Sequence, residues 1–250
     1  MTLKEFFAQH PKAAAAFSGG TDSAFLLWAA REYGCQVQAY YVKTAFQPAF
    51  ELEDAQALAQ ALSIPLTVLE LDIFSCPEAV ANGPDRCYFC KRTLFTQLWS
   101  RARRDGHTLL LDGTNASDDA GDRPGMRALR ELEVRSPLRE CGVTKDQVRR
   151  LSREAGLFTW DKPAYACLAT RVPTGTAVTP EALQRVENAE NILFKMGFSD
   201  FRIRLLGKNA LLQLPESQMD RLLPRRAEIL ERLKPCFSKL YLDLEARHGQ

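Results

Sequence analysis

The chain has 250 residues, 46% of them hydrophobic, which is enough for a packed α/β domain with a smaller domain appended. Its 33 Lys and Arg against 31 Asp and Glu leave a formal charge of +2, which excludes the strongly basic character of a dedicated nucleic-acid binder. No apolar run reaches the ~20 residues of a membrane span, and the N-terminus lacks a signal-peptide core, so we expect a cytoplasmic protein without a membrane partner.

Predicted strands and helices alternate through the first half of the chain. The hydrophobic pattern predicts strands at 13–17, 37–42, 66–71 and 109–112, and helices at 21–33 and 51–62. Alternation at this spacing is typical of an α/β fold with a doubly wound parallel sheet. In such a sheet ligands bind at the carboxyl ends of the strands.

A glycine-rich turn, Ser18-Gly-Gly-Thr-Asp-Ser23, joins the first strand to the first helix. Its glycines let the backbone approach an anion, and the N–H groups that open the following helix favour negative charge. The turn lacks the lysine of GxxxxGK[ST] and lacks GxGxxG, which argues against a Walker-type NTPase and a dinucleotide fold. SGGxDS resembles the pyrophosphate loop (PP-loop) of the ATP pyrophosphatase superfamily, whose members adenylate a substrate oxygen. The expected ATP-binding residues are Ser18, Gly19, Gly20, Thr21, Asp22 and Ser23; a plain Gly-Gly turn with a Ser cap is the alternative.

A second polar segment, Asp112-Gly-Thr-Asn115, follows the strand at 109–112. Both segments end strands of one parallel sheet, so we expect Gly113, Thr114 and Asn115 to contact ATP or magnesium together with Asp112. A helix N-cap is an equally good interpretation of Asn115.

The second half has a different order of elements. Helices are predicted at 144–156 and 179–196, with Thr144 and Thr179 at their starts. Strands at 201–205 and 210–214, a helix at 216–233 and a strand at 239–244 follow. This order predicts a small α+β domain, so the chain divides into a PP-loop domain at 1–175 and a second domain at 176–250.

Three of the seven cysteines lie in cation-rich segments. Cys87 and Cys90 form a CxxC in Arg86-Cys-Tyr-Phe-Cys-Lys-Arg92, and Cys167 lies four residues before Arg171. Neighbouring cations favour thiolate, which is both the metal ligand and the nucleophile. Three thiolates suit a 4Fe-4S cluster with one open iron, although catalytic or redox use without iron, zinc, and no metal stay open. The other cysteines, Cys35, Cys76, Cys141 and Cys236, are expected to be small buried hydrophobes.

Arg202 and Arg204 alternate along the predicted strand at 201–205. They therefore project from one face and make a suitable fork for a phosphate, with a solvent-facing strand surface as the alternative.

Five motifs in order resemble the LarE family of ATP-dependent sulfur transferases, over nearly the whole chain. They are SGGTDS, RCYFCK, DGTN with the following Asp118-Asp-Ala-Gly-Asp-Arg-Pro-Gly125, Val134-Arg-Ser-Pro-Leu138, and ACLATRVPTG. The resemblance implies a small nucleotide substrate, pyridinium-3,5-biscarboxylic acid mononucleotide. Its carboxylate is adenylated and becomes a thiocarboxylate, on the way to a nickel-pincer nucleotide cofactor.

The resemblance also implies roles for particular residues. Cys167 matches the cysteine common to two branches of the family: one sacrifices it as sulfur source, whereas the other binds a 4Fe-4S cluster with three cysteines. Cys87 and Cys90 match the extra pair of the second branch, which favours cluster ligands at Cys87, Cys90 and Cys167. Arg202 and Arg204 look like the ligands of the substrate phosphate. Family likeness further suggests a homo-oligomer, and the sulfide donor is unknown.

Elementary chemistry assigns the remaining roles. A carboxylate is a poor electrophile, so ATP must convert its oxygen to a leaving group, with Asp22 helping to hold Mg²⁺ beside the pyrophosphate. Sulfide on the cluster, or the thiolate of Cys167, would then expel AMP. Arg171 either orients the substrate carboxylates or pairs with a nearby acid.

Three other functions compete with this one. A tRNA thiolase would also combine a pyrophosphate loop with cysteines, but predicts a basic tract interleaved with aromatics. A synthetase using ammonia leaves the cysteines unexplained. A nucleotide or iron-sulfur carrier without turnover is the non-enzyme alternative.

Overall fold

The computed structural model describes residues 1–118 and 123–247, so part of the acidic run in Asp118-Asp-Ala-Gly-Asp-Arg-Pro-Gly125 lies outside the described residues. Two compact units divide the chain. The first comprises Met1–Thr44, Ala49–Ala79 and Asp85–Lys162, and the second comprises Ala45–Pro48, Val80–Pro84 and Pro163–Gln250. The predicted domain boundary after residue 175 stays a prediction.

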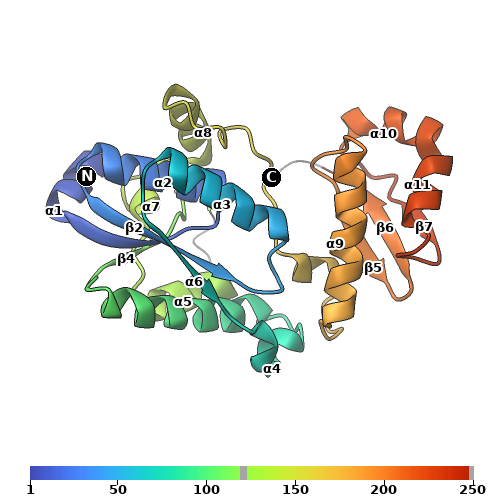
Figure 1. The fold of residues 1–250 in the computed structure, drawn as a ribbon, viewed down its shortest axis with the longest axis horizontal. Coiled ribbons are helices and arrows are strands. Elements are labelled where there is room, and N and C mark those ends of the chain that lie inside the picture. Colours follow the sequence, from blue (N-terminus) through green and yellow to red (C-terminus); the bar gives the residue numbers. More distant parts are fainter. Residues whose placement is uncertain (119–122, 248–250) are drawn as a thin grey trace. The chain divides into compact units, whose positions relative to one another are not determined.

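The first unit is an α/β fold with a four-stranded parallel sheet, as the alternating pattern predicts (Figure 1). The strand order is β3-β2-β1-β4. Strands β2 and β3 are added on one side of β1 and β4 is added on the other side, so the order in which strands are added reverses between β1 and β4. Its strands are β1 (Lys12–Ala16), β2 (Gln36–Lys43), β3 (Leu66–Glu70) and β4 (Leu110–Leu111). Its helices are α1 (Leu3–Gln9), α2 (Thr21–Glu32), α3 (Ala49–Ala61), α4 (Pro77–Val80), α5 (Arg86–Arg104), α6 (Pro124–Glu131), α7 (Pro137–Glu140) and α8 (Lys145–Glu154), with a 3-10 turn η1 (Ile73–Ser75).

Apolar residues cover both faces of this sheet. Alternate residues of β1 point to opposite faces, so Ala13 and Ala15 pack with α1, α2 and α3, whereas Ala14 packs with α5 and α6. Burial on both faces is why the strands read as continuous apolar runs. The two sequence segments that are expected to bind ATP follow β1 and β4. These are the neighbouring strands between which the strand order reverses.

Five helices of the first unit, α1, α4, α5, α6 and α7, were not predicted. Helix α1 begins with a capping box in which Thr2 and Glu5 exchange hydrogen bonds. Helix α5 carries the CxxC and extends over 19 residues, and α6 packs against it. Leu98, Trp99 and Ala102 of α5 are buried and recur at helical spacing, so the sequence carries a helical period here that the prediction missed.

The second unit is a small α+β fold around the three-stranded sheet β5-β6-β7. Strands β5 (Arg202–Leu206) and β6 (Asn209–Gln213) are antiparallel, whereas β6 and β7 (Leu240–Leu242) are parallel. The unit also contains the 3-10 turn η2 (Leu168–Arg171) and α9 (Pro180–Lys195), whose start is capped by Thr179 as predicted. The inner face of the sheet buries Ile203, Leu205, Ala210 and Leu212.

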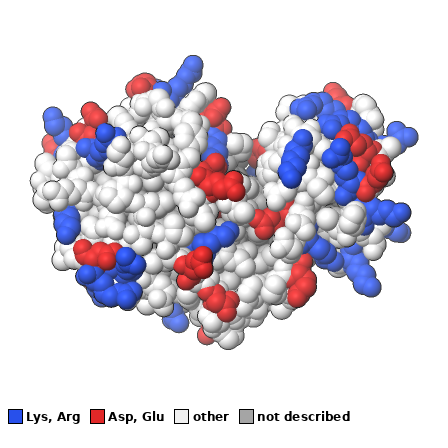
Figure 2. Space-filling model, viewed as in Figure 1, with Lys and Arg blue, Asp and Glu red and all other residues white. Residues whose placement is uncertain are grey.

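The single helix predicted at 216–233 is wrong. The chain forms α10 (Glu216–Leu222), a 3-10 turn η3 (Leu223–Arg225) and α11 (Arg226–Leu233). Pro224 has no N–H and its ring clashes with the preceding turn, so it interrupts the α-helix. Arg221 and Arg226 are exposed there, and Figure 2 shows lysines and arginines interspersed with acids around α10 and α11.

No helix within residues 1–118 and 123–247 has both the length and the apolar character that crossing a membrane requires.

Candidate functional site

The loop after β1 is a closed turn built from its own polar groups. Ser18 and Ser23 place their hydroxyl oxygens 3.1 Å apart, the Ser18 N–H donates to Ser23 Oγ at 3.3 Å, and Ser23 Oγ donates to the Gly20 carbonyl at 3.1 Å. Gly20 is the N-cap of α2, and no side chain of the described residues caps it. The first N–H groups of α2 therefore open onto the loop, where a phosphate can accept them.

Glycine is required at two positions of this site. Gly19 has φ +72°, and a Cβ there would lie 3.0 Å from the Glu51 carbonyl oxygen of α3. At Gly113 a Cβ would lie 2.8 Å from the Ser23 nitrogen, so the segment after β4 lies directly against the first turn of α2. The two predicted ATP segments are thus brought together by close backbone packing.

Asn115 and Lys145 hold the carboxylate of Asp22. Asn115 Nδ2 donates to Asp22 Oδ1 at 3.2 Å, and Lys145 Nζ donates to Asp22 Oδ2 at 2.6 Å. Asn115 Oδ1 accepts from the Ser117 N–H at 2.8 Å in a local turn, and no helix of the described residues begins there. The N-cap interpretation of Asn115 is therefore wrong, and its side chain orients Asp22.

A second lysine, Lys162, donates a hydrogen bond to the backbone of the glycine-rich loop. Lys162 Nζ donates to the Gly19 carbonyl at 3.2 Å and to Asp54 Oδ2 at 2.5 Å. Sequence analysis missed Lys145 and Lys162, which come from segments more than 120 residues after the loop they contact. Their only local signal is position, since Lys145 follows a capping threonine and Lys162 precedes a proline.

Other predicted residues of the loops have internal partners. The Thr21 hydroxyl donates to the Thr159 carbonyl at 2.7 Å. The buried Asp112 carboxylate accepts from Ser136 Oγ and Thr114 Oγ1, both at 2.5 Å. These side chains brace the two loops, which leaves their backbone groups for a ligand.

The CxxC lies in the first turns of α5. Cys87 and Cys90 are three residues apart on a helix, so their side chains share one face. Cys87 is exposed, and the Arg86 guanidinium lies 3.7 Å from its sulfur. The N-terminal end of α5, which is the positive end of its dipole, and the Arg86 guanidinium both place positive charge near the Cys87 sulfur.

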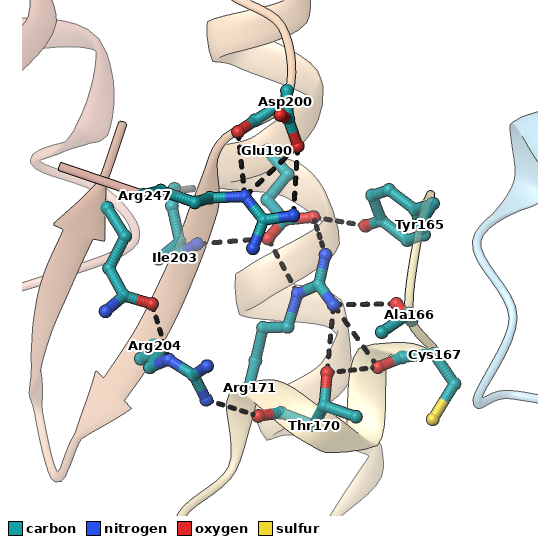
Figure 3. Close-up of polar contacts among 11 residues, drawn as sticks. Tyr165, Ala166, Cys167, Thr170, Arg171, Glu190, Asp200, Ile203, Arg204 and Arg247 are labelled. Carbon is teal, nitrogen blue, oxygen red and sulfur yellow. Dashed lines mark hydrogen bonds and ion pairs between the residues drawn. The ribbon is translucent and has the colours of Figure 1, made fainter. Parts of the chain in front are cut away.

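Cys167 lies in the second unit, at the N-cap of η2 (Figure 3). The Arg171 side chain is 1% exposed and pairs with Glu190 through Nε at 2.9 Å and Nη2 at 3.2 Å. Its Nη1 donates to the Ala166 carbonyl at 2.6 Å and to Thr170 Oγ1 at 2.9 Å. Of the two roles expected for Arg171, the structure therefore shows pairing with an acid, and its donors are occupied by protein groups rather than open to a substrate carboxylate.

Arg202 and Arg204 are two residues apart and lie on one face of β5, as predicted. Arg204 bonds neutral groups, the Gln213 amide oxygen at 2.6 Å and the Thr170 carbonyl at 3.1 Å. Burial together with the positive charges of Arg247, Arg171 and Arg204 lowers the pKa of Arg202. Burial with Arg171 and Arg247 likewise lowers the pKa of Arg204. Both guanidiniums therefore gain from an anion.

The remaining cysteines differ in burial. Cys35 is buried, as predicted, and burial raises the pKa of its thiol to about 11. Cys76, Cys141 and Cys236 are only partly buried, so the expectation of fully buried hydrophobes is wrong for these three.

Comparison with known proteins identifies the family. The family described as queuosine biosynthesis protein QueC matches residues 12–81, which include the glycine-rich loop. The pyridinium-3,5-bisthiocarboxylic acid mononucleotide synthase of Lactiplantibacillus plantarum is 32% identical over 206 residues, 82% of this chain and 75% of the relative. The chain belongs to the LarE family.

Two further relatives match most of this chain. An uncharacterized protein of Synechocystis sp. is 39% identical over 220 residues, 87% of this chain and 81% of the relative. An uncharacterized protein of Methanocaldococcus jannaschii is 28% identical over 244 residues, 97% of this chain and 93% of the relative. The LarE relationship and the nucleotide-type loop together make this chain an ATP-using sulfur transferase.

The cysteines fit a cluster only in part. Cys87 and Cys90 offer two adjacent sulfurs beside a cation, which suits two positions of an iron-sulfur cluster. Within residues 1–118 and 123–247, no three His, Cys, Asp or Glu side chains gather into a group that could hold a metal ion. At the loop, the single carboxylate of Asp22 suits Mg²⁺, which usually takes one or two carboxylates together with phosphates.

Proposed function

We propose that this LarE-family chain adenylates a carboxylate of pyridinium-3,5-biscarboxylic acid mononucleotide with ATP, releases pyrophosphate and converts the acid to a thiocarboxylate. One observation carries the adenylation step: the carboxylate of Asp22 lies between Asn115 and Lys145 at the mouth of an anion-binding loop. This arrangement joins a metal-binding oxygen to a donor-lined cradle, and pyrophosphate departure requires both.

Each group at the loop has a distinct proposed role. Backbone N–H groups of Ser18 to Ser23 cradle the pyrophosphate, and Gly113 and Thr114 contribute backbone groups from the adjoining segment. Asp22 holds Mg²⁺, which neutralises the charge that grows on the leaving oxygens. Lys145 and Lys162 lie within 3.2 Å of loop acceptors, and we propose that both turn to the triphosphate when ATP binds.

We propose Cys87, Cys90 and Cys167 as ligands of a 4Fe-4S cluster. When bound, such a cluster would carry the sulfide that becomes the thiocarboxylate sulfur. The alternative is that the thiolate of Cys167 itself attacks the adenylated carbonyl, expels AMP and ends as dehydroalanine once its carbon–sulfur bond breaks. The pair Cys87 and Cys90, with Arg86 beside Cys87, supports the first route, because the sacrificial route needs no second pair of cysteines.

The substrate phosphate is proposed to bind Arg202 and Arg204. In the second unit Arg171 is paired with Glu190 and Arg247 with Asp200, so their charges are compensated. Among the described residues, Arg204 hydrogen-bonds only neutral groups, and burial together with nearby positive charges lowers the pKa of Arg202. A phosphate monoester carries about two negative charges at neutral pH, which matches the two uncompensated guanidiniums.

Pyrophosphate release in the presence of the biscarboxylic mononucleotide tests the adenylation step. Asp22→Ala should abolish release, whereas Lys145→Met and Lys162→Met should each lower kcat/KM for ATP by about tenfold or more, as loss of a charged contact does. Asp146→Ala, an exposed acid of the same α8 turn, is the matched control and should leave release unchanged. Full release in the Asp22 variant would overturn the assignment.

We also propose that the chain works in the cytoplasm as a homo-oligomer. Light scattering of the purified protein tests the oligomer, and a monomeric mass at micromolar concentration would contradict it.

A further inference from the structure

Arg171 and Glu190 form a buried ion pair in the second unit (Figure 3). Each side chain is 1% exposed. The charge of Glu190 outweighs the effect of burial and raises the pKa of Arg171, so the pair is ionised. Desolvating two charges offsets most of their attraction, and an apolar pair of similar volume is often as stable. Stability alone therefore does not explain this pair.

The guanidinium of Arg171 holds both peptide groups of Cys167. Its Nη1 lies 2.6 Å from the Ala166 carbonyl oxygen and 3.4 Å from the Cys167 carbonyl oxygen, which belong to the peptides before and after Cys167. Thr170 Oγ1 accepts from the same nitrogen and donates to the Cys167 carbonyl at 2.8 Å. Two anchored peptide planes restrict the backbone of Cys167 and so fix the direction of its Cα–Cβ bond.

Glu190 connects these hydrogen bonds around Cys167, which we call the clamp, to strand β5, which carries the two arginines. Its Oε1 accepts the backbone N–H of Ile203 at 3.1 Å, the residue between Arg202 and Arg204. Its Oε2 also accepts from the Tyr165 hydroxyl, two residues before Cys167. Arg204 Nη1 completes the connection by donating to the Thr170 carbonyl at 3.1 Å. The segment 165–171 and strand β5 are thus tied through one buried acid.

We infer that Arg171 and Glu190 are positioning residues that set where the sulfur of Cys167 lies relative to Arg202 and Arg204. The inference rests on the proposed function, in which a substrate phosphate binds those arginines while Cys167 serves its carboxylate. Because the phosphate and carboxylates of a mononucleotide are joined in one small molecule and span a limited range of distances, an error of about 1 Å between the two anchors costs about 100-fold in rate.

The main test replaces the pair with an apolar pair, Arg171→Met with Glu190→Leu, which leaves no buried charge unpaired. The melting temperature and the rate of pyrophosphate release should stay near those of the unaltered chain. Thiocarboxylate formed per pyrophosphate released should fall about 100-fold. Equal efficiency in the double variant would overturn the inference, as would parallel loss of both steps.

Two milder variants guard against misfolding of the double variant. Thr170→Val removes only the hydroxyl bridge and should lower the transfer ratio partially. Arg171→Lys keeps the charge but lacks the planar fork that reaches Glu190 and the Ala166 carbonyl together, so it should not restore transfer. Full activity of Arg171→Lys would mean that charge alone matters. Arg225→Met, which removes a guanidinium bonded to Glu228 and the Met196 carbonyl, is the matched control and should keep the normal ratio.

A readout independent of turnover separates this inference from the proposed function. Hydrogen–deuterium exchange of the peptide covering 164–172 should accelerate at least about tenfold in the double variant, because hydrogen bonds to a charged group are lost. The Arg225 control should not show this. If the unaltered chain makes no thiocarboxylate, the proposed function fails, whereas unchanged exchange in the double variant contradicts the clamp itself.

Discussion

Gly19 combines a left-handed backbone with a crowded position. Its φ of +72° is strained for any residue with a Cβ, and that Cβ would meet the Glu51 carbonyl oxygen at 3.0 Å. The loop therefore approaches α3 through glycine only. Residues of this kind are conspicuous in a sequence, but the reason for them is a contact with another element.

Gly19→Ala is expected to weaken ATP binding and to lower the free energy of unfolding by about 1–3 kcal/mol, because strain and contact act together. Calorimetry with ATP and chemical denaturation measure the two effects. Gly34→Ala is the matched control, since Gly34 has φ +80° but no atom within 4 Å of its Cβ position. Equal ATP affinity in the Gly19 variant and the unaltered chain would show that the loop does not hold the nucleotide.

At the scale of elements, α5 decides what the CxxC can do. The motif lies in the first two turns of a 19-residue helix, at the positive end of the helix dipole and beside Arg86. Cys87 is exposed, so its sulfur is available to iron or a sulfur donor. In a loop, the same two cysteines would lack the nearby positive end of a helix dipole.

Cys87→Ala should leave pyrophosphate release intact and stop thiocarboxylate formation, because the proposed role of Cys87 begins after adenylation. Iron and sulfide content of protein purified without oxygen should fall in parallel. Cys236→Ala, a partly buried cysteine of the second unit, is the control. Equal loss of both chemical steps in the Cys87 variant would make the pair structural.

His107 links α5 to the sheet and introduces pH dependence. Its ring is 5% exposed, and Nε2 lies 3.1 Å from the Gln38 side-chain oxygen of β2. Burial, together with Lys12, lowers its pKa below 6.5, although Asp105 opposes this. The folded state therefore holds the neutral ring, while the unfolded chain binds a proton as pH falls through 6.5.

This contribution to stability is complete above pH 6.5 and is lost as the pH falls toward the depressed folded value. His107→Gln should thus flatten the decline in unfolding free energy below pH 6.5, as measured by urea denaturation across pH. His10→Gln, at the partly exposed end of α1, is the control. An unaltered slope in the His107 variant would contradict the assignment.

At the scale of the whole molecule, the proposed chemical roles are divided between two units. The first unit contains the glycine-rich loop and the CxxC, and the second contains Cys167 and the arginines of β5. The chain enters the second unit three times, through 45–48, 80–84 and from 163 onward. Within that unit the Leu168 N–H donates to the Phe46 carbonyl at 2.8 Å, which gives the segment after Cys167 a partner distant in sequence.

Intact mass after turnover distinguishes the two sulfur routes. With a cluster, the chain should keep its mass through many cycles when sulfide is supplied. A loss equal to H₂S confined to Cys167, with one product per chain, would establish the sacrificial route instead. The Cys167→Ala variant is the reference, because neither route can alter the mass of a chain without that cysteine.

The sequence by itself determined the parallel α/β fold, the ATP-type loop and the capped helices α8 and α9, because these depend on local spacing. Glycines, capping threonines and alternating apolar runs act within a few residues of one another. It also determined the LarE family, through motifs in order. The predicted elements did not include α5, although its buried residues recur at helical spacing, or the break at Pro224.

Tertiary structure alone decided which side chains meet. Asp22 is held by Asn115 and Lys145, and Lys162 lies on the Gly19 carbonyl, although these residues are 93 to 143 positions apart. Of the two roles that the sequence left open for Arg171, the tertiary structure shows the buried pairing with an acid, Glu190. Such pairings depend on how sheets and helices pack, and no linear spacing encodes them, because burial and distance arise only once distant segments share one core.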